Sequence, residues 1–363
     1  MRIPHTFLAA GLLACSTLAQ AAPSYQVNVV LDTWYYGSIR AINNRGDAVG
    51  DIDSHGPLPT LYYDGTAGEL VPMRRGSNLW LDLLGHMNNH GVVALTNVDR
   101  SGTGPYGYDA QLFDAATQQY TSLSKPMGYG ASGASSINDA GVVVGYAEYD
   151  GGSGSPVTHA TAWVNGVPAD LGTLGVRSQA TDINTQGTVV GDTGFANGAT
   201  GAFLYQGGKM VALGTLGGAS SWARAVNDSN VVVGGSATAG SALSTAFIYQ
   251  NGVMADLGAG AGSEALDINA AGAVVGIANH RGFIYTGGKV TMLDQLLDPA
   301  SGWTVREANA INDLGQIGAT VCGGADNACV AAILNPVPEP SGYAMLLAGL
   351  GLVGLAARRR SLA

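Results

Sequence analysis

Short apolar segments alternate with polar turns along the body of the chain, and one such unit returns seven times. Each copy has an apolar residue followed by asparagine, usually a glycine three residues later, and then a short β-branched run. The copies lie at 41–50, 86–95, 136–145, 182–191, 225–234, 267–276 and 310–319. Their asparagines (Asn43, Asn88, Asn138, Asn184, Asn227, Asn269 and Asn312) recur on average about every 45 residues, which is a typical period for a repeat architecture.

Each copy predicts a β-hairpin. Asparagine tolerates left-handed backbone angles and can bond its own loop, and the following glycine supplies a positive φ at little steric cost. Asn230 replaces that glycine in the fifth copy. The valines then begin the partner strand, because β-branched side chains suit a pleated surface.

Two further strands follow in most copies. The third is apolar and aromatic, at 61–63, 162–164, 202–205, 246–249 and 282–285, and the fourth lies at 170–175, 212–217 and 256–258. Four short strands in about 45 residues match one blade of a β-propeller. Small alanine and serine residues before the Ile-Asn pair suit an innermost strand near a crowded axis. We therefore expect an all-β, seven-bladed propeller over 23–335, with an open repeat β-solenoid as the alternative.

The two ends of the body suggest how the ring closes. The last copy has only three strands, between 308 and 334, while a lone strand at 25–32 precedes the first copy. We expect this lone strand to complete the last blade.

The repeats resemble the HAF repeats of bacterial extracellular proteins. The likeness rests on the Ala-Phe-Leu-Tyr type of strand, on Asp-Leu-Gly-Thr-Leu-Gly and on the Ile-Asn-x-x-Gly-x-Val-Val-Gly phrase, over about 40–334. The eponymous His-Ala-Phe survives poorly, and its nearest counterpart is the segment 159–163. The resemblance implies an extracellular repeat protein and carries no agreed biochemical activity.

The first 22 residues have the layout of a secretory signal peptide. Arg2 precedes an apolar run that is too short for a stable membrane anchor, and small residues follow it. We expect cleavage after Ala21 or Ala22. The alternative is a lipoprotein signal in which Cys15 would be lipidated.

Residues 336–363 form a second, separate segment. Val337 is followed by Pro338, Glu339 and Pro340; two prolines around a glutamate cannot extend a strand or sit inside a helix, so they make a stiff tether. The apolar stretch 341–357 is marginal for a transmembrane helix, and Arg358, Arg359 and Arg360 would hold its end on the cytoplasmic side. A plain membrane anchor would explain these features.

The order of these parts resembles the PEP-CTERM sorting signal of Gram-negative bacteria. That resemblance implies an exosortase as processing partner and transient anchoring in the inner membrane through 341–357. It also implies delivery to the outer surface or extracellular matrix, in bacteria that make exopolysaccharide.

Charge and cysteine content narrow the possible partners. Without Arg2 and the three C-terminal arginines the body keeps 12 basic residues, and without Glu339 it keeps 25 acidic ones, so its net charge is near −13. This balance argues against binding nucleic acid or an anionic membrane surface. Cys322 and Cys329 are seven residues apart in an exported chain, which predicts a disulfide. Zinc ligation is the alternative, although no second Cys or His pair lies near them.

No catalytic pattern emerges from the body. Its five histidines are spread over four repeats, with only His86 and His90 in the same copy. Asp139, Asp228 and Asp313 are explained by roles in their own turns. The aspartates at 51, 53, 294 and 298 lack the full calcium-loop pattern. We therefore expect no catalytic residues, no metal and no cofactor.

Polar residues on the expected inner strands are possible ligand contacts at a funnel opening, or solvated structural groups. They are Arg40, His86, Asp182, Arg224, Asp267 and Asn309. The function that we expect is a non-catalytic surface or matrix protein associated with exopolysaccharide or biofilm. The alternative is a carbohydrate-binding propeller or a secreted carbohydrate-active enzyme.

Overall fold

The computed structural model describes residues 24–31, 36–53, 60–73, 83–99, 107–126, 130–151, 156–241, 243–323 and 328–337. The predicted signal peptide, its expected cleavage site and the segment beyond Val337 lie outside these residues. No helix in the described part is long and apolar enough to cross a bilayer.

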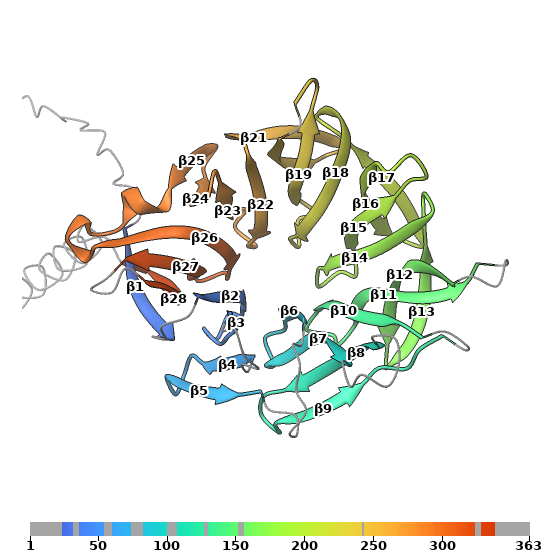
Figure 1. Ribbon diagram of the computed structural model, residues 1–363, viewed down its shortest axis with the longest axis horizontal. Helices are drawn as coiled ribbons and strands as arrows, with labels where there is room; N and C mark the ends of the chain where they lie inside the picture. The colour runs from blue at the N-terminus through green and yellow to red at the C-terminus, as the bar shows by residue number, and fades with distance from the viewer. Residues whose placement is uncertain are drawn as a thin grey trace, which may run out of the picture. The chain divides into compact units, whose positions relative to one another are not determined.

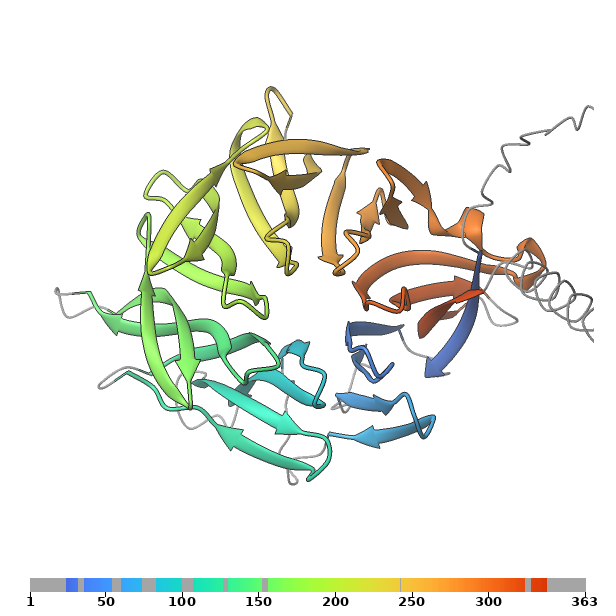
Figure 2. The same ribbon diagram turned by 180° about the vertical axis from the view of Figure 1, so that it is seen from behind.

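The unit Tyr25–Val337 consists of seven four-stranded sheets arranged in a ring (Figure 1; Figure 2 shows the other side). We call the space at its centre, where residues of all seven blades line a pocket, the central channel. The sheets follow one another as blades 1 to 7, which confirms the seven-bladed propeller and excludes the solenoid.

In each of the first six blades, four consecutive strands run from the channel outward. Blade 1 holds β2 (Tyr36–Ile42), β3 (Ala48–Asp53), β4 (Leu61–Asp64) and β5 (Glu69–Pro72). Blade 2 holds β6 (Leu83–Met87), β7 (Val92–Asp99), β8 (Gly107–Asp114) and β9 (Gln119–Ser122). Blade 3 holds β10 (Ser132–Ile137), β11 (Val143–Asp150), β12 (Pro156–Val164) and β13 (Val167–Gly172).

The remaining blades repeat the plan. Blade 4 holds β14 (Arg177–Ile183), β15 (Val189–Gly194), β16 (Thr200–Gln206) and β17 (Lys209–Gly214). Blade 5 holds β18 (Gly217–Val226), β19 (Val232–Thr238), β20 (Ser244–Gln250) and β21 (Val253–Ala261). Blade 6 holds β22 (Ser263–Ile268), β23 (Val274–Ala278), β24 (Arg281–Thr286) and β25 (Lys289–Met292), followed by two short 3-10 helices, Leu293–Leu296 and Pro299–Ser301.

Blade 7 is assembled from both ends of the body. Its strand order is β1-β28-β27-β26, with β26 (Trp303–Ile311), β27 (Ile317–Gly323) and β28 (Ala328–Val337) from the last repeat and β1 (Ser24–Leu31) as the outer strand. Tyr25 is 6% exposed and packs in the same apolar cluster as Leu293, Leu296 and Leu334. The expectation that the lone N-terminal strand completes the last blade is confirmed.

One aromatic side chain from the third strand fills each of five blade interfaces. Phe283 of blade 6, for example, is fully buried among Val233, Ala246 and Leu257 of blade 5. Phe113, Trp163, Phe203 and Phe247 occupy the corresponding places in blades 2 to 5, each against the preceding blade. Burial of one such side chain contributes about 2–3 kcal/mol, so the ring is held largely by these apolar contacts.

The glycine that ends the Val-Val-Gly phrase has a steric cause. In blade 4 a Cβ added to Gly191 would lie 2.1 Å from the carbonyl oxygen of Gln179 on the inner strand. The pairing of β14 with β15 shifts between Ala180 and Asp182, which is a β-bulge. The bulge brings the two backbones so close that no side chain fits between them.

The hairpin loops agree with the sequence in all but one respect. The glycine three residues after the repeat asparagine has positive φ, as at Gly187 (82°), and Asn230 takes the same conformation with φ of 57°. The repeat asparagine itself is not among the residues with positive φ, so the idea that it adopts left-handed angles is wrong. Its side chain fixes the loop instead.

Candidate functional site in the central channel

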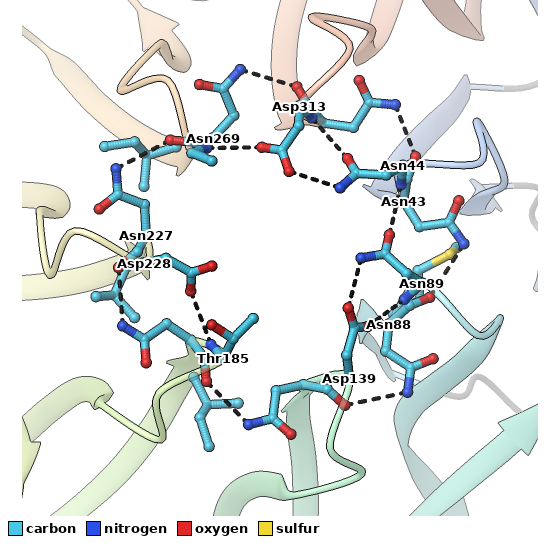
Figure 3. Close-up of a pocket in the computed structure, with 18 of the residues that line it drawn as sticks. Asn43, Asn44, Asn88, Asn89, Asp139, Thr185, Asn227, Asp228, Asn269 and Asp313 are labelled. Carbon is cyan, nitrogen blue, oxygen red and sulfur yellow. Dashed lines mark hydrogen bonds between the residues drawn. The ribbon is translucent and has the colours of Figure 1, made fainter.

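The seven repeat asparagines form a closed ring of hydrogen bonds at one end of the channel (Figure 3). In each blade Oδ1 accepts backbone N–H groups of its own loop; for Asn184 the donors are Gln186 and Thr188, at 3.1 and 2.9 Å. The Nδ2 atom of each asparagine donates to the main-chain oxygen of the asparagine in the next blade, over 2.8–3.3 Å. The side chain therefore shapes its own loop and joins it to the neighbour.

The next residue in each repeat forms a second, more exposed layer. At five of the seven blade junctions the N–H of this residue donates to the side chain of its counterpart in the following blade, as from Thr185 to Asp228 at 3.0 Å. Asp139 and Asp313 accept in the same way from Asn89 and Ala270. The sequence-based interpretation of these aspartates as groups serving their own turns is wrong, because they link adjacent blades.

These two layers surround a pocket of about 190 Å³. Each blade contributes three consecutive residues to its wall: an apolar residue, the repeat asparagine and the residue that follows, which is Asn, Asp, Thr or Ala. Figure 3 shows the polar groups arranged around an open centre. The space is large enough for a few water molecules or a small polar solute.

His86, Asp182 and Asp267 lie beyond the ring, on the inner strands of blades 2, 4 and 6. His86 Nδ1 is 3.4 Å from Asp182 Oδ1, which also accepts the hydroxyl of Ser136 at 2.8 Å. Each aspartate clamps the next blade: Asp182 accepts the N–H of Val226 at 2.9 Å, and Asp267 that of Ile311 at 2.7 Å.

The shared environment shifts the pKa values of these three groups. Burial disfavours the charged imidazole, but the hydrogen bond to Asp182 and the charges of Asp182 and Asp267 prevail and raise the pKa of His86 to about 9. Burial raises the pKa of Asp267 to about 6, although His86 and the Ile311 N–H oppose it. Burial also acts on Asp182, yet His86 and the Val226 and Ser136 donors keep its pKa below the usual value.

The other polar residues named from the sequence do not join this group. Arg40 is half exposed and pairs with Asp51 of its own blade at 3.0 Å. Asn309 donates to Ser38 Oγ and to the carbonyl of Ile39, at 2.9 and 3.1 Å, across the closure between blades 7 and 1. Arg224 pairs with Glu264. The six polar residues named from the sequence therefore lie in four separate parts of the ring.

A second polar group spans blades 4 to 6, and Arg224 is the one member that was named from the sequence. Trp222 donates its Nε1 hydrogen to Glu264 Oε1 at 2.7 Å, and the Nε of Arg224 donates to the same oxygen. Asp192 is 8% exposed and accepts from Gln179 Nε2 at 3.4 Å. Gln179, Trp222 and Glu264 all stand five residues before their repeat asparagine, a register that the sequence already displayed.

Cys322 and Cys329 form the disulfide that their spacing predicted. They face each other across β27 and β28, with Cα atoms 4.0 Å apart. His159 contacts Asp170 at 2.9 Å and stacks on Tyr149. The described residues contain no group of three or more His, Cys, Asp or Glu side chains suited to a metal ion.

Known structures support the fold class. The chain is similar to the β-propeller domain of the Trilobed protease from Pyrococcus furiosus, which has an open velcro topology, with 11% identity over 71% of this chain and 81% of that one and a TM-score of 0.50. It is also similar to a prolyl endopeptidase, with 10% identity over 85% of this chain and 51% of that one and a TM-score of 0.51. At such identities the likeness shows the β-propeller fold alone.

The sorting segment is defined by its own match. Residues 336–360 match the PEP-CTERM protein-sorting motif, which indicates exosortase-dependent export to the cell surface with a transient membrane stage. No curated protein of similar sequence matches the chain.

Proposed function

We propose that this chain is a non-catalytic propeller of HAF-type repeats, secreted through its signal peptide. An exosortase delivers it to the surface or extracellular matrix of a Gram-negative bacterium, where it associates with exopolysaccharide in a biofilm. The observation that carries the proposal is the sorting motif at 336–360, which begins within β28, the last strand of the ring.

The use of the channel carboxylates supports a non-catalytic role. Asp182 and Asp267 each accept a main-chain N–H of the adjacent blade, and Asp182 also holds Ser136 and His86. Carboxylates engaged in this way stabilise the ring and are poorly placed to exchange protons with a substrate.

Cell fractionation with and without the exosortase tests the proposal. With the enzyme present, we expect a shortened chain in the outer-surface and extracellular fractions, co-sedimenting with the bacterium's own exopolysaccharide. Without it, the full-length chain should stay in the inner membrane. An uncut chain in the inner membrane of both strains would contradict sorting.

A carbohydrate-active enzyme is the second candidate, favoured by the raised pKa values of Asp267 and of the buried Asp192. A screen for release of reducing sugars from polysaccharides, repeated with Asp267→Asn and Asp192→Asn, tests it. Turnover that either variant abolishes without unfolding the ring would establish this alternative over the non-catalytic role.

A further inference from the structure

The group of side chains shared by blades 4 to 6 has the composition of a sugar site. We propose that Trp222, Arg224 and Glu264 bind an uncharged pyranose unit of a polysaccharide, with the indole as stacking platform. The inference rests on the proposed association with exopolysaccharide and gives it a location. It concerns residues outside the ring of asparagines and outside the His86 group.

The indole of Trp222 is held in one orientation. Its pairing partner on β19 is Gly235, where an added Cβ would lie 2.8 Å from Cε2 and Cζ2 of the ring, so the indole lies against the bare glycine. The hydrogen bond from Nε1 to Glu264 fixes the ring edge from the neighbouring blade. Trp222 nevertheless stays partly exposed. A rigid aromatic ring with accessible surface suits the apolar C–H face of a pyranose, because stacking then costs little side-chain entropy.

Planar polar groups stand beside the platform. The side chain of Arg224 keeps 41% of its surface and that of Glu264 keeps 20%, so both remain within reach of a ligand in solvent. A guanidinium donates and a carboxylate accepts, which together satisfy neighbouring hydroxyls that act as both. The shared contact at Glu264 Oε1 holds the two groups next to the indole.

Local charge selects for a neutral sugar. Two guanidinium groups, Arg177 and Arg224, act on the buried Asp192, and Arg224 also pairs with Glu264. Two cations therefore meet two carboxylates, and the cluster has no excess positive charge with which to hold a uronic acid. The body as a whole carries a charge near −13, which repels a polyanion.

Calorimetric titration of the mature ring (residues 23–337) with defined hexasaccharides tests the site. The neutral probes are cellohexaose, maltohexaose and mannohexaose, and hexagalacturonate is the anionic probe. We expect at least one neutral hexasaccharide to bind with Kd in the millimolar range or tighter. Trp222→Ala should weaken it at least tenfold, Trp222→Phe about threefold, and Glu264→Gln at least fivefold.

Two matched controls stand elsewhere in the ring. Trp303→Ala removes another partly exposed tryptophan, on β26 of blade 7. Arg281→Ala removes another ion-paired arginine, on β24 of blade 6, whose partner is Asp294. Both should bind as the wild type does. Thermal melts of every variant establish that the ring is folded, and Glu264→Gln provides the test if Trp222→Ala does not fold.

The possible results separate this inference from the proposed function. If Trp222→Ala and Glu264→Gln bind as well as the wild type, the sugar site is elsewhere and this inference fails. If only hexagalacturonate binds, the choice of an uncharged ligand fails. If no probe binds while the chain still reaches the surface and co-sediments with exopolysaccharide, this inference fails and the proposed function stands.

Discussion

Asn312 and Asn43 are 269 residues apart in the chain, yet Nδ2 of Asn312 donates to the main-chain oxygen of Asn43 at 2.8 Å. This bond closes a circle in which every blade makes the same donation to the next. Loss of one asparagine side chain therefore disturbs a loop and an interface together.

Asn184→Ala removes two acceptor bonds within the loop and the donor bond to Asn227. We expect the free energy of unfolding to fall by about 3 kcal/mol, measured by denaturant titration. Asn184→Asp keeps the acceptor and should cost about half as much. Thr185→Ala, at an exposed neighbouring position, should cost almost nothing. Wild-type stability of Asn184→Asp would mean that the bond between blades contributes nothing.

The closing strand should be essential for the whole ring. Tyr25→Ala removes a buried aromatic group from the blade 7 cluster, so we expect a loss of about 3 kcal/mol and a melting temperature lower by several degrees. Deletion of residues 24–31 should lower it much further. Gln26→Ala, on the exposed side of β1, is the matched control. An unchanged melting point after the deletion would show that three strands suffice for blade 7.

The His86 group predicts a stability that declines in alkaline solution. The pKa of His86 is about 9 in the folded protein, above its ordinary value of about 6.5, so the folded state binds this proton more tightly. The stabilisation is therefore complete below about pH 6.5 and is lost as the pH rises through 9. We expect a loss on the order of 2 kcal/mol, allowing for the partial exposure of the imidazole to channel water.

Melting curves between pH 6 and pH 10 measure this loss. The charged groups that act on His86 are Asp182 and Asp267. His86→Gln should flatten the profile, while His280→Gln, at an exposed turn, should leave it as in the wild type. Identical profiles for the wild type and His86→Gln would count against the interaction.

The close approach at the bulge predicts that Gly191→Ala is severely destabilising. The new Cβ would lie 2.1 Å from a carbonyl oxygen, and the backbone would have to move, at a cost of about 3 kcal/mol or more. Gly130→Ala serves as control, because its Cβ would contact only the Glu148 carboxylate at 3.8 Å. Soluble expression and denaturant titration of both variants measure the difference. Equal stability would show that the bulge can relax.

The disulfide should stabilise β27 and β28 modestly. It closes a short loop, so chain entropy predicts a contribution of about 2 kcal/mol. Addition of a phosphine reductant should lower the melting temperature of the wild type by a few degrees. The double variant Cys322→Ser and Cys329→Ser should melt at the lower temperature and not respond to the reductant.

The blades could be predicted from the sequence because the signals that define each blade lie close together in the chain. The Ile-Asn phrase, the β-branched run and the third-strand aromatic all act within one repeat of about 45 residues. The missing fourth strand at the end and the spare strand at the start then indicated the closure, which required only counting strands. The structure confirms both.

The contacts between blades were harder to predict. The side chain of Asn184 was expected to serve its own loop, but nothing local shows that Nδ2 reaches the carbonyl of Asn227. His86 and Asp182 come from blades 2 and 4, and only the narrow channel brings them together. Trp222 was not among the residues named from the sequence; the signal that could have found it is its position five residues before the repeat asparagine, which Gln179 and Glu264 share.

The third strand of blade 7 also determines where mechanical load enters the domain. β28 ends at Val337, inside the segment that matches the sorting motif, and it is bonded to β27 on one side and adjoined by β1 on the other. While the tail is still uncut, tension on it is transmitted to a strand that has a neighbouring strand on each side. At the far end of that strand Cys329 is joined covalently to Cys322 of β27. A pulling force on the tail therefore acts on an interior strand that is also held by a disulfide. The ring can withstand a force that would detach an edge strand.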